Sequence, residues 1–167
     1  MQAFEWSNEN GCLPTYNFKE GVFELSKEMD GYMLEKLHVG RKGCPMCNMQ
    51  CGHIIKDSSG QDAELDYENV GMLGPNIGIR SLPQAGQLNR MADEWGLDTI
   101  SLGSCIGFLM EGSEKRLIPE KIKWGDFEAA QKLTVEIGKG EGLGKLVSQG
   151  VKAASETLGK GSQKWAM

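Results

Sequence analysis

The sequence contains no long hydrophobic run and no excess of basic residues. No apolar stretch among its 167 residues approaches the roughly 20 that a helix needs to cross a bilayer, so we expect no membrane span. The net charge is −5 at pH 7, which gives a nucleic-acid partner no electrostatic support. These absences argue against membrane and nucleic-acid proteins, and we expect a cytoplasmic protein with one sizeable core.

Sustained alternation of apolar and polar residues, the pattern of a half-buried strand, is also missing. Only Ile54-Ile55, just before a turn at Ser58-Ser59-Gly60, predicts a brief strand. Helical spacing of apolar residues is common instead. The sequence therefore predicts an all-α fold, a single α-helical domain over residues 1–167 with about six helices and an irregular cysteine-rich loop.

Apolar spacing, capping residues and helix breakers give approximate positions for these helices. Residues 1–17 look irregular, because Asn, Gly and Pro break any period there. In the first half of the chain, the expected helices are residues 18–29, a short helix capped by Asp30, and one or two helical turns after residue 66 that end at Gly74-Pro75. In the second half, they are residues 82–95, residues 99–111 capped by Asp98, a helix capped by Asp126 and ended by Gly138, and residues 143–158.

The helix expected over residues 99–111 is apolar on nearly every side, as in a helix at the centre of a domain. It nevertheless contains Gly103 and Gly107, and each glycine costs a helix about 1 kcal/mol relative to alanine. We therefore expect these glycines to allow the close approach of another backbone or of a bulky ligand.

The most informative segment is the cysteine cluster between Gly43 and His53. Cys44, Cys47 and Cys51 have C-x2-C-x3-C spacing among Gly, Pro, Asn and Met residues, and such a loop can aim three sulfurs at one point. Three thiolates at such short distances repel one another unless a metal binds them. The candidates are an iron–sulfur cluster, held by cysteine thiolates, and tetrahedral zinc.

The chain lacks the second cysteine pair that structural zinc sites usually have, which favours the cluster. His53 could be a fourth zinc ligand, although it is only two residues beyond Cys51. A disulfide or free thiols are the least favoured alternative, because five cysteines is an odd number. We expect isolated Cys12 and Cys105 to be buried as small apolar residues.

Four segments, in order, resemble the tungsten- or molybdenum-pterin aldehyde ferredoxin oxidoreductase family. They are Leu13-Pro14-Thr15-Tyr16-Asn17-Phe18, the cysteine loop Cys44–Cys51, Asp66-Tyr67-Glu68-Asn69 with Gly74-Pro75-Asn76 behind it, and the D-x-x-G-L-D signature Asp93-Glu94-Trp95-Gly96-Leu97-Asp98. Asn48, Asp66 and Asn69 depart from the residues that this family often has, but none of them is an expected ligand.

The resemblance implies specific roles for several residues. Cys44, Cys47 and Cys51 would be three of the four ligands of a 4Fe-4S cluster, with the fourth in a later domain. Glu68 would transfer protons near the metal. One of two pterin dithiolenes that hold tungsten or molybdenum would contact Asp93, Gly96, Leu97 and Asp98.

From the residues alone, simpler roles stay open for the acids. Asp98 can be only a helix cap and Asp93 a surface acid. Glu68 belongs to an acidic stretch and can be a surface residue, whereas an acid–base role would need burial to move its pKa towards neutrality. We expect His38 and His53 to be structural or exposed.

For the whole protein, the resemblance implies oxidation of an aldehyde to a carboxylic acid, with electrons leaving through the cluster to ferredoxin. The chain would be the middle domain of this larger oxidoreductase, with flanking domains and homo-oligomers as further partners. We expect it to be inactive in isolation and able to lack both cluster and pterin, because one cluster ligand and half of the cofactor cradle are outside the chain. Two other classes remain: a free-standing iron–sulfur electron-transfer module and a zinc-stabilised helical interaction domain.

Overall fold

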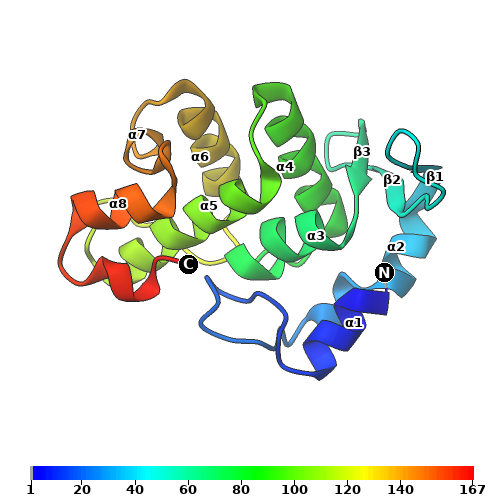
Figure 1. Cartoon of the computed structure of the whole chain (residues 1–167), viewed down its shortest axis with the longest axis horizontal. Coiled ribbons are helices and arrows are strands. Elements are labelled where there is room, and N and C mark those ends of the chain that lie inside the picture. Colours follow the sequence, from blue (N-terminus) through cyan, green and yellow to red (C-terminus); the bar gives the residue numbers. More distant parts are fainter. Residues whose placement is uncertain (1) are drawn as a thin grey trace.

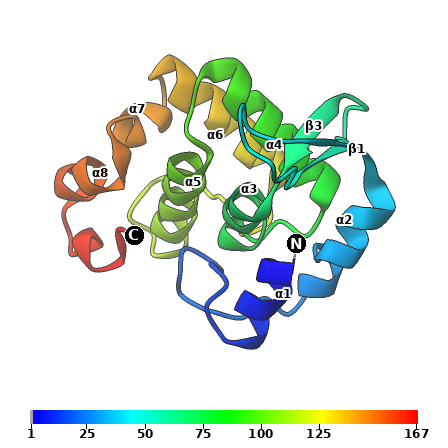
Figure 2. The same ribbon diagram turned by 45° about the vertical axis from the view of Figure 1, so that its right-hand side comes forward.

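The computed structural model describes residues 2–167, which form a mainly helical domain with one small sheet (Figures 1 and 2). The helices are α1 (Gln2–Glu9), α2 (Gly31–Leu37), α3 (Tyr67–Leu73), α4 (Leu82–Trp95), α5 (Thr99–Glu114), α6 (Phe127–Lys139), α7 (Gly144–Val147) and α8 (Gly150–Leu158). Three short 3-10 helices are η1 (Ser26–Glu28), η2 (Pro75–Ile77) and η3 (Ser162–Trp165). In both views the sheet and α2 lie at one end, α7 and α8 lie at the other, and α5 runs between them.

The sheet corrects the prediction of an all-α fold. Strands β1 (His38–Lys42), β2 (Gly52–Lys56) and β3 (Asp62–Leu65) pair antiparallel in the order β1-β2-β3. The strands are four or five residues long, and β1 is mostly exposed and polar, so no long alternation marks them in the sequence. The sheet packs on α4 at Gly86, where an added Cβ would lie 3.2 Å from the Ala63 Cβ.

The N-terminal third contains two further corrections. Residues 2–9 form α1 although the sequence looked irregular there, and residues 18–29 form turns and η1 rather than a helix. Tyr16, Asn17 and Phe18 all have left-handed backbone angles, with φ between 50° and 59°. The N–H groups of Tyr16 and Asn17 donate to the carbonyls of Pro75 and Asn76, at 3.0 and 2.8 Å. These long-range contacts override the helical spacing.

Several helix boundaries agree with the sequence prediction because short polar side chains cap them. Helix α4 spans the predicted residues 82–95. The predicted caps are confirmed in α2, α5 and α6, whose N-terminal amides donate to Asp30, Asp98 and Asp126. Helix α6 runs beyond Gly138 and ends at Gly140, which has φ 66°. The last predicted helix is divided into α7 and α8 just before Gly150, whose φ is 86°.

Helix α5 lies at the centre of the core, with continuous burial from Leu102 to Gly112. Gly103 faces α3 so closely that an added Cβ would be 2.6 Å from the carbonyl oxygen of Met72. The expected close approach of another backbone is therefore confirmed at Gly103. None of the helices in the described residues is long and apolar enough to span a membrane.

Candidate metal and cofactor site

The three clustered cysteines lie on the loop that joins β1 to β2, residues 43–51. Pairing of Lys42 with Gly52 closes the loop at its base. Cys44, Cys47 and Cys51 are all exposed. The N–H of Cys47 donates to the Cys44 carbonyl at 3.0 Å, so the C-x2-C segment forms a turn that keeps these two cysteines close together.

This donor set is compatible with an iron–sulfur cluster. Within residues 2–167, no three His, Cys, Asp or Glu side chains stand close enough together to hold a single metal ion. In a four-iron cluster each thiolate binds a different iron, so the cysteines do not have to surround one point. Three exposed thiols on one loop without helix or strand fit that requirement, with one ligand still to be supplied.

An ion pair anchors the β1 end of the cysteine loop. Lys42 Nζ lies 2.8 Å from Glu64 Oε2 on β3. The Glu64 carboxylate fills the space in which a side chain at Gly52 would sit, so the loop base is tightly packed. The bond to Glu64 raises the pKa of Lys42, and the charges of Asp93 and Cys44 raise this pKa further. The positive charge of Lys42 therefore interacts with the charges of both Cys44 on the cysteine loop and Asp93 on α4.

A buried histidine contacts the other end of the loop. His53 on β2 is only 4% exposed. Its Nδ1 lies 2.9 Å from the Cys51 carbonyl oxygen, and its Nε2 lies 3.1 Å from Glu35 Oε1 on α2. Glu35 also accepts a bond from Arg41 at 2.7 Å, and the bond from His53 lowers the pKa of Glu35. From the sequence alone, His53 could be a fourth zinc ligand or a structural residue. Its burial and its two contacts fit the structural role.

The D-x-x-G-L-D signature covers the end of α4, which carries Asp93, and the turn Gly96-Leu97-Asp98 that leads to α5. Gly96 adopts φ 64°, and an added Cβ there would meet nothing within 4 Å. Asp98 accepts the Ser101 N–H at 2.7 Å, and this bond lowers its pKa, so Asp98 is a helix cap whatever else it does. Partial burial and Glu64 raise the pKa of Asp93. A small hollow of about 100 Å³, lined by Leu97 and Asp98 among others, lies beside this turn.

Glu68 lies in the first turn of α3 and shares a hollow with the cysteine loop. The hollow has a volume of about 760 Å³, and its lining includes Cys51, His53, Asp66 and Glu68. Glu68 is exposed in this chain, so the described residues do not supply the burial that an acid–base role would need. Burial raises the pKa of neighbouring Asp66, which caps α3.

Two of the predicted site residues outside the cysteine loop, Glu68 and Asp93, lie near it. Cys51 and Glu68 border one hollow, and Lys42 lies in the field of both Cys44 and Asp93. The Gly96-Leu97-Asp98 turn follows directly from the end of α4 that carries Asp93.

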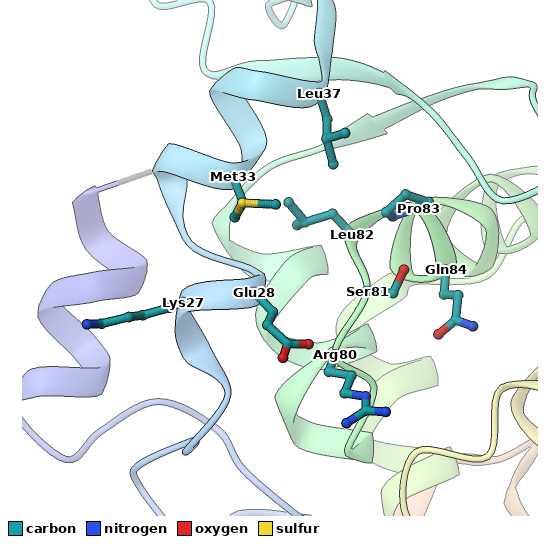
Figure 3. A pocket seen from close by; sticks show the side chains of 9 residues that line it. All are labelled: Lys27, Glu28, Met33, Leu37, Arg80, Ser81, Leu82, Pro83 and Gln84. Atoms are coloured by element: carbon teal, nitrogen blue, oxygen red, sulfur yellow. The ribbon is translucent and has the colours of Figure 1, made fainter.

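Another hollow lies apart from these residues, between α2 and the start of α4 (Figure 3). It has a volume of about 540 Å³ and is lined by none of the predicted site residues. Met33 and Leu37 face Leu82 and Pro83 across it, while the Lys27 side chain points away. This hollow therefore does not support the predicted metal or pterin chemistry.

The two isolated cysteines differ from each other. Cys105 on α5 is buried as predicted, and burial raises the pKa of its thiol to about 11. Cys12 is exposed, so its predicted burial was wrong. It lies in the turn after α1, where its N–H donates to the Ser7 carbonyl and the next residue, Leu13, enters the core instead.

Comparison with known proteins decides the family. Residues 1–167 match the family model described as aldehyde ferredoxin oxidoreductase, domains 2 and 3. The chain belongs to the aldehyde ferredoxin oxidoreductase family.

Similar members of this family include tungsten-containing aldehyde ferredoxin oxidoreductases of archaea. The protein of Pyrococcus furiosus is 35% identical over 161 residues, which are 91% of this chain and 27% of that protein. The protein of Thermococcus kodakarensis is 33% identical over the same shares of the two chains. An aliphatic sulfonate oxidoreductase, WOR-like subunit, of Pyrococcus furiosus is 31% identical over 68% of this chain and 19% of its own length. The chain thus spans about a quarter of the length of the aldehyde ferredoxin oxidoreductases that it matches.

A solved structure has a similar fold. It is the active site complex BamBC of benzoyl coenzyme A reductase in complex with 1,5-dienoyl-CoA, with a TM-score of 0.75. The match covers 97% of this chain and 26% of that chain. The sequence identity of 21% means that this similarity shows the fold alone.

Proposed function

We propose that this aldehyde ferredoxin oxidoreductase domain holds a 4Fe-4S cluster beside a tungsten- or molybdenum-pterin, as the middle domain of a larger enzyme. The observation that carries the proposal is the placement of three exposed thiols on one hairpin loop that borders the same hollow as Glu68. The cluster and the metal-pterin would supply the redox chemistry, in which an aldehyde and water give a carboxylic acid, two protons and two electrons, and the electrons pass singly through the cluster to ferredoxin.

The residues of this chain would bind and position those groups. Cys44, Cys47 and Cys51 would bind three irons, and a cysteine outside this chain would bind the fourth. The carboxylates of Asp93 and Asp98 would accept N–H groups of one pterin, since bonds to an ionised acceptor are the strong ones. The backbone of Gly96 and Leu97 would leave room for the flat ring to approach.

Glu68 would accept a proton released during aldehyde oxidation. Its carboxylate borders the hollow at the end of the cysteine loop, where a substrate or a water molecule has room. A flanking domain of the whole enzyme would cover Glu68 and supply the low-dielectric surroundings that a proton-transfer group requires.

The metal part of the proposal is testable on the 167-residue chain with cobalt(II) as the probe. In oxygen-free buffer, we expect the loop to rearrange so that its three thiols, which do not surround one point in this structure, bind about one cobalt per chain with intense thiolate-to-cobalt absorption. This absorption should be lost in Cys44→Ser, Cys47→Ser and Cys51→Ser and kept in the control Cys12→Ser, which removes an exposed thiol outside the loop. Binding that survives each loop substitution would refute the assignment of these cysteines.

The identity of the natural metal needs a separate measurement. We expect iron and sulfide, with no stoichiometric zinc, when the longer protein that contains this chain is purified without air. Stoichiometric zinc and no iron would instead support the zinc-stabilised interaction domain.

A further inference from the structure

The environment of His53 is built around the main chain of a cysteine rather than around its sulfur. Nδ1 lies 2.9 Å from the Cys51 carbonyl oxygen, and this oxygen can only accept a hydrogen bond. Nδ1 must therefore carry a proton and donate it, and the contact of Nε2 with the Glu35 carboxylate is a second donated bond in the imidazolium form, which has a proton on both nitrogens. His53 is buried in β2, so the donor is held in place by the sheet and does not move with the loop.

The second ring nitrogen fixes the orientation of the first. Nε2 lies 3.1 Å from Glu35 Oε1, and Arg41 binds the same carboxylate oxygen at 2.7 Å. This contact prevents the imidazole from turning over, which would remove Nδ1 from the Cys51 carbonyl. The three side chains come from α2, β1 and β2, so the arrangement links three elements to one end of the cysteine loop.

The consequence follows from the length of the loop. Residues 43–51 have no helical or strand structure, and all three cysteines on the loop are exposed. Cys51 precedes Gly52, the first residue of β2, so strand pairing limits its position on one side only. Without a further contact, the Cys51 peptide could still rotate and change the position of its thiol relative to the other two cysteines. Metal binding would restrict Cys51 to one of these positions, and this restriction costs conformational entropy.

We propose that His53 is a positioning residue that holds Cys51 in its metal-binding position through the Nδ1–carbonyl hydrogen bond, with Glu35 fixing the imidazole. This inference rests on the proposed metal-binding role of the three cysteines. His53 does not bind the metal itself, and its contribution is to hold one ligand before the metal arrives.

Two substitutions separate the two ring nitrogens. In His53→Asn the amide nitrogen takes the position of Nδ1, so the bond to the Cys51 carbonyl is kept and the contact with Glu35 is lost. In His53→Gln the amide group reaches the position of Nε2, so the contact with Glu35 is kept and the bond to Cys51 is lost. His38→Gln is the control for loss of an imidazole beside Glu35, because His38 lies 3.8 Å from the Glu35 carboxylate and its ring packs against that of His53.

The first measurement is cobalt(II) affinity of the 167-residue chain in oxygen-free buffer, read from the thiolate-to-cobalt absorption. We expect His53→Gln to weaken binding roughly 3- to 10-fold, the effect of one lost hydrogen bond. His53→Asn and His38→Gln should stay within about 2-fold of the wild-type chain. Equal affinity in His53→Gln and the wild type, or equal losses in His53→Asn and His53→Gln, would overturn the proposal.

The second measurement needs no metal and tests the anchor by itself. Amide hydrogen exchange of residues 49–52 in the metal-free chain should be faster in His53→Gln than in the wild type and unchanged in His53→Asn. Unchanged exchange in His53→Gln would overturn the proposal. A wild-type chain that binds no cobalt would refute the proposed metal site, whereas the exchange data would still decide whether His53 holds the loop.

Discussion

Gly103 allows α5 to pack against α3, and its replacement by alanine tests how closely the central helices are fitted. A Cβ added at Gly103 would lie 2.6 Å from the Met72 carbonyl oxygen and 2.8 Å from the Met72 Cβ. Favourable contacts between such atoms lie at roughly 3.5 Å. The carbonyl belongs to the backbone of α3 and cannot rotate away, so the two helices must move apart.

The expected loss of stability follows from two opposing effects. Alanine is favoured over glycine in a helix by about 1 kcal/mol. Overpacking a core costs about 1–3 kcal/mol, and a clash with backbone belongs at the upper end of that range. Separation would also lengthen the bond from Asn76 Nδ2 to the Gly103 carbonyl, which is already 3.2 Å. We therefore expect Gly103→Ala to lower the free energy of unfolding by about 2 kcal/mol and the Tm by roughly 4–8 °C.

The assay is urea and thermal unfolding followed by circular dichroism, and Gly71→Ala is the matched control. Gly71 is also a buried helical glycine, in α3, but a Cβ added there would meet nothing within 4 Å. Alanine at position 71 should therefore stabilise the protein by about 0.5–1 kcal/mol. If Gly103→Ala proved as stable as Gly71→Ala, the reasoning about the contact between α3 and α5 would be wrong.

Three further predictions concern single side chains. Burial raises the pKa of Asp57, but hydrogen bonds from Ser59 and Arg90 outweigh burial and leave this pKa lowered. The ionised Asp57 therefore stabilises the folded protein fully above the unfolded-state pKa, and this contribution is lost as the pH falls through the folded-state pKa. Asp57→Asn should thus lower stability to urea at pH 7 more than at pH 3, and equal losses would contradict this. Thiol reagents should modify four of the five cysteines in the native chain and Cys105 only after unfolding; a reactive native Cys105 would contradict its burial. Asp98→Ala should cost about 1 kcal/mol in unfolding free energy, whereas Asp98→Ser should keep most of the cap, and equal stability of Asp98→Ala and wild type would argue against capping.

The parts of the fold that could be predicted from sequence depend on contacts between residues near each other in the chain. Asp98 and Asp126 each cap a helix by accepting a bond from the backbone N–H three residues later in the chain, so a short sequence window contains the whole interaction. The end of α4 is equally local, because Gly96 supplies the left-handed conformation that ends the helix. Helices bounded by such residues were placed closely.

The parts that were mispredicted depend on distant residues. Residues 18–29 have helical spacing, yet the chain just before them is held by bonds from Tyr16 and Asn17 to residues 75 and 76. The Asn17 side chain also donates to the Glu111 carboxylate, 94 positions away. No window of local sequence contains these interactions, and they determine the path of the N-terminal segment.

The small sheet connects the mispredicted part of the fold with the candidate site. Strand β2 begins directly after Cys51, and β3 ends one residue before the cap of the helix that carries Glu68. Strand β3 also carries Glu64, which binds Lys42 and raises the pKa of Asp93. The sequence motifs gave the identities of the candidate residues, but their arrangement depends on this sheet. The predicted brief strand at Ile54-Ile55 is confirmed in β2, but β1 and β3 leave no recognisable pattern in the sequence. Motif and periodicity alone could therefore predict the components of the site and not their spatial relation.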